Sequence, residues 1–193
     1  MAGTTPAQPL RALEALGGHY GSGPGVAMTP IPARAHVSLR SRPETVSALG
    51  QALGIALPLR PKTSAEADGL AALWLGPEDW LLVGADAASR SATDLIAAVE
   101  GSGIAAHSAV DVSNRYVGIT VDGPAAQAVL SAGCPQDLRL RTFPVGAVSR
   151  SVMSKADVVI WRRGETRFEV LCVRSFADYV WAFLVEAARA PAV

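Results

Sequence analysis

Two apolar segments separated by a short turn restrict the fold of this chain more than any other feature of its sequence. Residues 70–75 and 80–83 are almost entirely apolar, and the sequence Gly-Pro-Glu-Asp lies between them. These residue types favour a chain reversal, so the two segments predict an antiparallel β-hairpin. The chain is therefore expected to contain an antiparallel sheet.

The patterns on either side of this hairpin predict further strands and helices. Residues 34–40 alternate apolar and polar side chains, as a half-buried strand does. Pro43 begins a helical pattern that continues to about Leu53, and a second helical pattern covers residues 91–100. Another strand is predicted over residues 105–110. The order of elements in this part of the chain is β-α-β-β-α-β.

The second half nearly repeats this order. A strand is predicted over residues 116–121, followed by a helix from Gly123 to about Gly133. Three strands follow, at residues 146–154, 157–162 and 167–173, and then a long closing helix that begins near Ser175. We predict an α+β fold, with a single domain over residues 34–193 made of two ferredoxin-like halves, about 34–110 and 111–190. This symmetry rests on element order alone.

The first 33 residues differ in composition from the remainder of the chain. One short helix is predicted at residues 9–16, before the segment GGHYGSGPGVAMTPIP. The density of glycine and proline in that segment argues against regular structure over most of its length. Residues 1–33 are therefore expected to form an extended arm that lies on another surface.

The overall composition restricts the classes of partner. Half of the 193 residues are hydrophobic and 18% are charged, which excludes intrinsic disorder and leaves apolar surface for a protein partner. Lys and Arg together number 17, as do Asp and Glu, so no net charge attracts nucleic acid or an anionic membrane. The first residues lack the pattern of a secretion signal, and we expect a cytoplasmic protein without a membrane span.

No catalytic, cofactor-binding or metal-binding residue is predicted from motifs. The glycine-rich segment 21–26 resembles a dinucleotide-binding loop, but Val26 occupies the third required glycine position and no strand precedes it. His19, His36 and His107 lack the spacing of a compact metal site. His36 falls on the polar side of its predicted strand, which favours a surface position.

Both cysteines have apolar neighbours. Cys134 and Cys172 are expected to be buried, reduced and unreactive, because an apolar environment disfavours the thiolate.

Trp74 and Trp80 are predicted to face each other across the hairpin. We interpret this pair as part of the scaffold rather than as a binding site, because paired aromatic side chains stabilise hairpins.

A polar turn at residues 110–115 is a candidate contact with another protein. Asp111 and Arg115 are able to hold charges of a partner, and Arg174 is able to pair with a carboxylate across an interface. The alternative is a local turn in which these polar side chains satisfy backbone N–H groups.

The closing helix has two apolar stripes, whereas a monomer needs one. Phe176, Val180, Phe183 and Leu184 form the stripe that is expected to face the core. Trp181, Val185 and Ala188 form the second stripe, so Trp181 is predicted to lie at a subunit contact. The alternative is that the N-terminal arm covers Trp181 within the same chain.

Three stretches together resemble a known family. They are LWLGPEDWLLVG, AVDVSNRYVGITVDGPAAQAVLSAGCPQDLRLRTFPVG and VLCVRSFADYVWAFLVEA, and they occur in the order and spacing of the gamma subunit of heterotetrameric sarcosine oxidase. The resemblance covers about residues 70–188. It implies a fold related to the folate-binding domain of aminomethyltransferases and an accessory chain that carries no cofactor itself.

The resemblance also implies the partners and the reaction of the complex. The expected partners are an alpha subunit that binds NAD and tetrahydrofolate, a beta subunit with FAD and FMN, and a delta subunit with zinc. Such a complex oxidatively demethylates sarcosine to glycine, transfers the one-carbon unit to tetrahydrofolate and produces hydrogen peroxide. A free-standing folate-dependent aminomethyltransferase-like protein and a subunit of a related methylated-amine oxidase remain alternatives.

Overall fold

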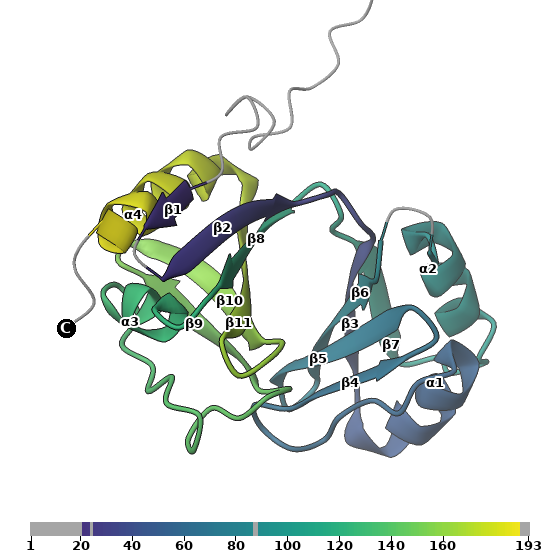
Figure 1. Ribbon diagram of the computed structural model, residues 1–193. Helices are drawn as coiled ribbons and strands as arrows, with labels where there is room; N and C mark the ends of the chain where they lie inside the picture. Colours follow the sequence, from purple (N-terminus) through teal and green to yellow (C-terminus); the bar gives the residue numbers. More distant parts are fainter. Residues whose placement is uncertain (1–20, 24, 87–88, 190–193) are drawn as a thin grey trace, which may run out of the picture.

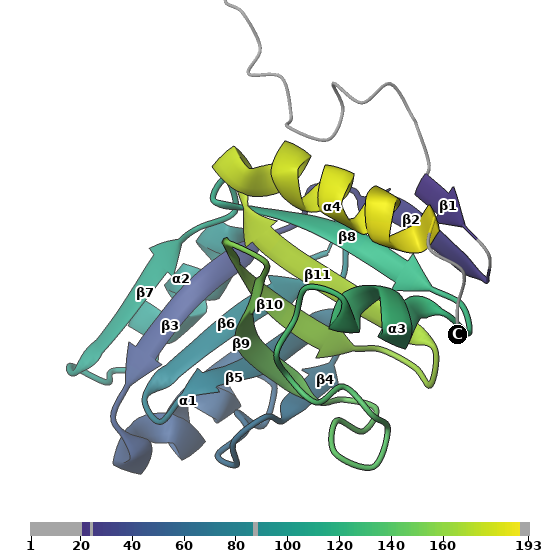
Figure 2. The same cartoon turned by 90° about the vertical axis from the view of Figure 1, so that its left-hand side faces the viewer.

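The computed structural model describes residues 21–23, 25–86 and 89–189, and it confirms an α+β fold with two antiparallel sheets. The helix predicted at residues 9–16 lies outside the described residues. The elements are arranged in layers, which Figures 1 and 2 show from two directions.

The first sheet has the strand order β4-β5-β6-β3-β7. Its strands are β3 (His36–Ser41), β4 (Ser64–Ala67), β5 (Leu70–Gly76), β6 (Asp79–Gly84) and β7 (His107–Asp111). A short 3-10 turn (Pro43–Thr45) leads into α1 (Val46–Leu53), and α2 (Ala92–Glu100) precedes β7. Ser91 and Asp94 form a capping box that fixes the start of α2. Each of these helices was predicted within a few residues of its observed position.

The second sheet has the strand order β1-β2-β8-β11-β10-β9. Its strands are β1 (Gly21–Gly23), β2 (Val26–Ile31), β8 (Tyr116–Asp122), β9 (Val148–Met153), β10 (Ala156–Arg162) and β11 (Arg167–Val173). Helix α3 (Ala126–Ser131) follows β8, and α4 (Ala177–Arg189) follows β11 after a 3-10 turn (Arg174–Phe176).

Strand β2 corrects the expectation that residues 17–32 lack regular structure over most of their length. Met28 of β2 pairs with Val121 of β8, and both side chains are fully buried. Pro30 has no backbone N–H, but β1 pairs only with residues 26–28, so within the described part of the chain Pro30 has no strand on its other side. Residues 26–31 thus supply an inner strand of the second sheet, between β1 and β8.

The two sheets pack face to face, and helices cover their outer faces. Figure 1 shows α1 and α2 on the outer face of the first sheet and α3 and α4 on the outer face of the second. A separate apolar core fills the space between the sheets. It is formed by Ala71, Leu73, Leu81, Val83, Val148, Val159, Trp161 and Leu171. Strands β5 and β6 are therefore buried on both faces.

The tryptophan pair belongs to the scaffold, as predicted. Trp74 lies directly opposite Trp80 in the β5–β6 hairpin, and both pack in the core beneath α1 and α2. Trp80 is fully buried, and its Nε1–H donates a hydrogen bond to the carbonyl oxygen of Pro58 at 2.7 Å. A buried indole with a satisfied N–H stabilises the hairpin and leaves no polar group for a ligand.

Both cysteines are buried and unpaired, as predicted. Burial raises the pKa of the Cys172 thiol to about 12, so the thiol stays protonated at neutral pH. The sulfur atom of Cys134 lies 3.2 Å from the hydroxyl oxygen of Ser151.

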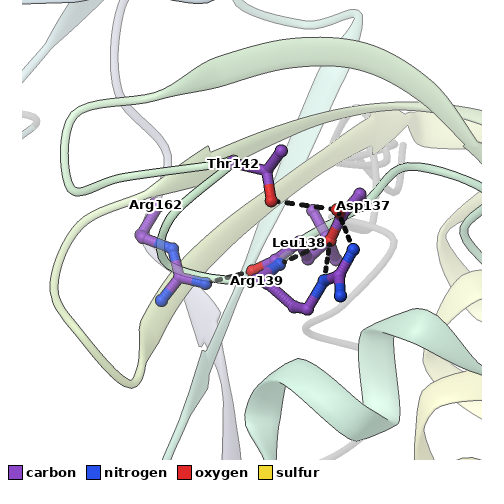
Figure 3. A network of polar contacts seen from close by, with 5 residues as sticks. All are labelled: Asp137, Leu138, Arg139, Thr142 and Arg162. Atoms are coloured by element: carbon purple, nitrogen blue, oxygen red, sulfur yellow. Dashed lines mark hydrogen bonds and ion pairs between the residues drawn. The ribbon is translucent and has the colours of Figure 1, made fainter.

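The connection from α3 to β9 is held in place by the polar network in Figure 3. The guanidinium of Arg162, which is 1% exposed, donates hydrogen bonds to the carbonyl oxygens of Leu138 and Glu165. The carboxylate of Asp137 accepts hydrogen bonds from Arg139 and Thr142, which hold the Asp137 pKa well below its usual value. These contacts tie the connection to the end of β10.

Candidate functional site between the two sheets

Residues 30–36 cross from the second sheet to the first, and a cavity lies on each side of this crossing. One cavity, of about 290 Å³, is called the His36 cavity below. It is lined by Pro30, Ile31, Pro32, Ala33, Arg34, His36, Ser113, Asn114, Tyr116, Val117, Gly118, Leu171 and Arg174. The other cavity, of about 570 Å³, shares Arg34 and residues 30–32 with the first and extends toward Glu66 and Arg163.

His36 is 4% exposed, which corrects the prediction that it lies at the surface. Its strand, β3, alternates as expected, but the side that carries His36 faces the second sheet instead of solvent. Burial and the positive charge of Arg34 lower the pKa of His36 to about 4, against weaker opposing effects of the Arg34 backbone and the Asp111 carboxylate. The imidazole is therefore neutral at pH 7. Its ring lies 5.8 Å from the Tyr116 ring at a tilted angle.

Arg34 and Glu169 form a buried ion pair beside His36. A terminal nitrogen of Arg34 lies 2.5 Å from a carboxylate oxygen of Glu169, and both side chains are 7% exposed. The other Glu169 oxygen lies 3.1 Å from Nε of Arg163. A terminal nitrogen of the same Arg163 side chain lies 2.6 Å from a carboxylate oxygen of Glu66. Because Glu66 is on β4 and Glu169 is on β11, these charges connect the two sheets.

The structure places Asp111, Arg115 and Arg174 around the same polar turn. Asp111 accepts a hydrogen bond from the backbone N–H of Ser113 at 2.8 Å, and contacts with Ser113 lower its pKa. This is the local turn that we considered as the alternative to a partner contact. Arg115 is exposed and lies over the Tyr116 ring, and its carbonyl oxygen accepts a hydrogen bond from the Arg174 backbone N–H. Arg174 lines the His36 cavity.

Trp181 lies in the core of this chain. Its side chain is 6% exposed and packs in the cluster between the second sheet and its helices, and α4 contacts β1 from the N-terminal segment. This burial favours the alternative in which the same chain covers the indole. Phe176, by contrast, was expected in the core but is 41% exposed, because it belongs to the 3-10 turn before α4 and is rotated away from the helical stripe.

Sequence reasoning did not select Arg34, Glu169 or Tyr116. One signal was available, because Glu169 is a charged residue within the apolar sequence Phe-Glu-Val-Leu-Cys-Val. A charge in such a strand is normally paired in the fold. The sequence offered no means of choosing Arg34 as the partner, since the two residues are 135 positions apart.

Within residues 21–23, 25–86 and 89–189, no group of three or more His, Cys, Asp or Glu side chains is placed to hold a metal ion. None of the helices in these ranges is long and apolar enough to cross a membrane.

Residues 40–190 match the family model of the sarcosine oxidase gamma subunit. The chain belongs to this family. The match begins upstream of residue 70, where the resemblance of the three sequence stretches began. A sarcosine oxidase gamma subunit from Arthrobacter sp. is 32% identical over 95% of this chain and 88% of its own length. A gamma subunit from Corynebacterium sp. strain P-1 is 31% identical over the same shares of both chains.

Solved structures agree with this membership of the gamma subunit family. A chain of the heterotetrameric sarcosine oxidase from Corynebacterium sp. U-96, solved in complex with pyrrole 2-carboxylate, superposes with a TM-score of 0.81. It is 27% identical, and the match covers 94% of this chain and 95% of that chain. The glycine cleavage system aminomethyltransferase T from Bartonella henselae superposes with a TM-score of 0.64 at 20% identity, over 93% of this chain and 50% of that chain. The second likeness shows a shared fold.

Proposed function

We propose that this chain is the non-catalytic structural subunit of a heterotetrameric sarcosine oxidase, in which it packs against the alpha, beta and delta subunits in the cytoplasm. The observation that carries the proposal is the match to a chain of a heterotetrameric sarcosine oxidase over nearly the full length of both chains. Membership of the gamma subunit family supports the same conclusion.

The chemistry of the complex is assigned to its other subunits. In this proposal FAD, FMN, NAD, tetrahydrofolate and zinc are held by the partner chains, and sarcosine is converted to glycine there. The gamma subunit contributes a rigid surface that stabilises those compartments. Asp111, Arg115 and Arg174 are the residues proposed to contact a partner, because they gather at one end of the inter-sheet crossing and Arg115 is exposed.

Co-expression tests this function directly. A tagged copy of this chain is expressed with the alpha, beta and delta subunits of a sarcosine oxidase, and the purified material is assayed for hydrogen peroxide with sarcosine and with dimethylglycine. We expect all four subunits to co-purify and sarcosine to be oxidised, whereas the isolated chain shows no turnover. Arg115→Ala is expected to weaken co-purification, and Lys155→Ala, which changes an exposed residue in the β9–β10 turn, serves as the matched control.

Two results would contradict the proposal. One is a fully active complex that assembles without this chain. The other is folate-dependent aminomethyl transfer by the isolated chain, which would favour the aminomethyltransferase-like alternative.

A further inference from the structure

Three buried polar atoms at the His36 cavity lack a well-aligned hydrogen bond, although the Arg34 backbone interacts with the His36 imidazole. Among the described residues, four buried side-chain nitrogen or oxygen atoms make no hydrogen bond with acceptable geometry: Nε of Arg34, Nδ1 and Nε2 of His36, and Nε of Arg162. Three of these four atoms belong to two residues that line the same cavity. Buried polar groups are normally paired, since an unpaired group keeps its full desolvation penalty. The clustering indicates that the cavity receives a polar group.

The unpaired atoms define which hydrogen-bond donors and acceptors that group must have. A neutral imidazole has one nitrogen that donates and one that accepts, and Nε–H of Arg34 is a further donor. A matching group must accept and donate hydrogen bonds along one edge. A carboxylate only accepts and an ammonium only donates, so neither pairs with both Nε–H of Arg34 and the accepting nitrogen of His36.

The charges at the cavity favour an uncharged group. The guanidinium of Arg34 is already neutralised by Glu169 at 2.5 Å, and His36 is neutral at pH 7. Arg174 also lines the cavity and carries a positive charge, so an anionic compound has to be included in any test.

The shape of the cavity favours a small, flat molecule. Its volume of about 290 Å³ is at the lower end of the range of roughly 300–1,000 Å³ for small-molecule sites. Ile31, Val117 and Leu171 supply apolar lining, and the rings of Tyr116 and His36 supply flat faces. Such a lining fits one or two aromatic rings.

We propose that the His36 cavity is a binding site for a small, flat, uncharged nitrogen heterocycle with a carbonyl beside an N–H, which pairs with His36 and Arg34. In this arrangement the carbonyl accepts a hydrogen bond from Nε–H of Arg34. The heterocycle N–H donates to the accepting nitrogen of the His36 imidazole. The proposal concerns this chain alone and does not depend on its assembly with other subunits.

The test is a titration of the full chain with three probes, followed by protein-observed NMR and calorimetry. 2-Pyridone has the required edge, toluene has a ring without polar atoms, and benzoate is an anion of similar size. We expect 2-pyridone to bind most tightly and to shift the ring resonances of His36. His36→Phe keeps an aromatic ring and removes both nitrogens, so we expect it to weaken 2-pyridone binding at least tenfold.

His107→Phe is the matched control, because His107 lies on the neighbouring strand β7 and does not line the cavity. It should leave 2-pyridone binding unchanged. Equal binding of toluene and 2-pyridone would overturn the proposal, as would tightest binding of benzoate or unchanged binding in His36→Phe. Binding of none of the probes by the wild-type chain would also overturn it. The His36 resonances of the wild-type chain decide the question even if His36→Phe does not fold.

Discussion

At the scale of single residues, His36 shows how the fold alters the ionisation of a side chain. The residue has an ordinary polar position in an alternating strand, but a second sheet covers that side of the strand. Burial disfavours the charged imidazolium, and the nearby charge of Arg34 adds to this effect. The stability of the protein should therefore depend on pH through His36.

We predict that stability falls as pH decreases from about 6.5 to about 4, and that His36→Phe removes much of this fall. Over this range the unfolded chain binds a proton at His36 that the folded chain excludes, so acid favours unfolding. The contribution is about 3 kcal/mol, present in full above pH 6.5 and lost by about pH 4. Urea unfolding of both proteins across this pH range measures it. Parallel pH profiles for the two proteins would contradict the prediction.

At the scale of elements, β2 joins a segment rich in glycine and proline to the second sheet. The strand buries Val26 and Met28 against the second sheet's core and leaves Ala27 and Thr29 exposed. The alternation of buried and exposed side chains over residues 26–29 is the pattern of a half-buried strand. The proline content concealed this pattern, since Pro30 is tolerated only where no neighbouring strand needs its N–H.

Met28→Ala is predicted to destabilise the chain by about 2–5 kcal/mol, because it removes a fully buried side chain from β2. Thr29→Ala, at the next and exposed position of the same strand, should change stability by less than about 0.5 kcal/mol. Chemical unfolding of the purified variants distinguishes them. If both variants match the wild-type chain, residues 26–31 are not part of the folded core.

Helix α4 supports a second prediction at this scale. Trp181→Ala should lower the stability of the isolated chain by about 3–5 kcal/mol, because the indole is 6% exposed in the core. Phe176→Ala, which changes an exposed ring before the helix, should have a much smaller effect. Thermal melting is measured beside co-purification with the other subunits. An unchanged melting temperature together with lost co-purification would show that Trp181 lies at a subunit contact, as the sequence predicted.

At the scale of the whole molecule, the two sheets are held together by the apolar core between them and by buried charges at the edge of that core. Arg34, Glu169, Arg163 and Glu66 alternate in sign and link the crossing segment to both sheets. The guanidinium of Arg163 also lies 3.8 Å from the centre of the Trp161 ring. The central pair is shielded from solvent, whereas Glu66 is 53% exposed.

Glu169→Gln is predicted to destabilise the chain by about 3–5 kcal/mol, because it leaves the buried charge of Arg34 without its counter-ion. Glu66→Gln removes a solvent-exposed charge of the same network and should cost less than about 1 kcal/mol. Urea unfolding at pH 7 compares the two variants directly. Equal effects of the two substitutions would show that solvent reaches the Arg34–Glu169 pair.

The sequence by itself determined the type and order of most elements, because alternation and helical spacing are properties of neighbouring residues. The strand over residues 167–173 has the predicted bounds, and Val46, Leu49 and Leu53 are buried on α1 as their spacing indicated. Three stretches of the sequence also pointed to the gamma subunit family, which the family match confirms.

Only the tertiary structure decided which surfaces these elements meet. Strand β2 pairs with β8, about 90 residues further along the chain, and the polar side of β3 is covered by the second sheet, in which β8 to β11 all lie after residue 115. The burial of His36, the pairing of Arg34 with Glu169 and the covering of Trp181 all follow from such distant contacts. The periodicity of a strand shows that its two faces differ. Whether a given face contacts solvent or another layer of the fold depends on residues that lie far away in the sequence.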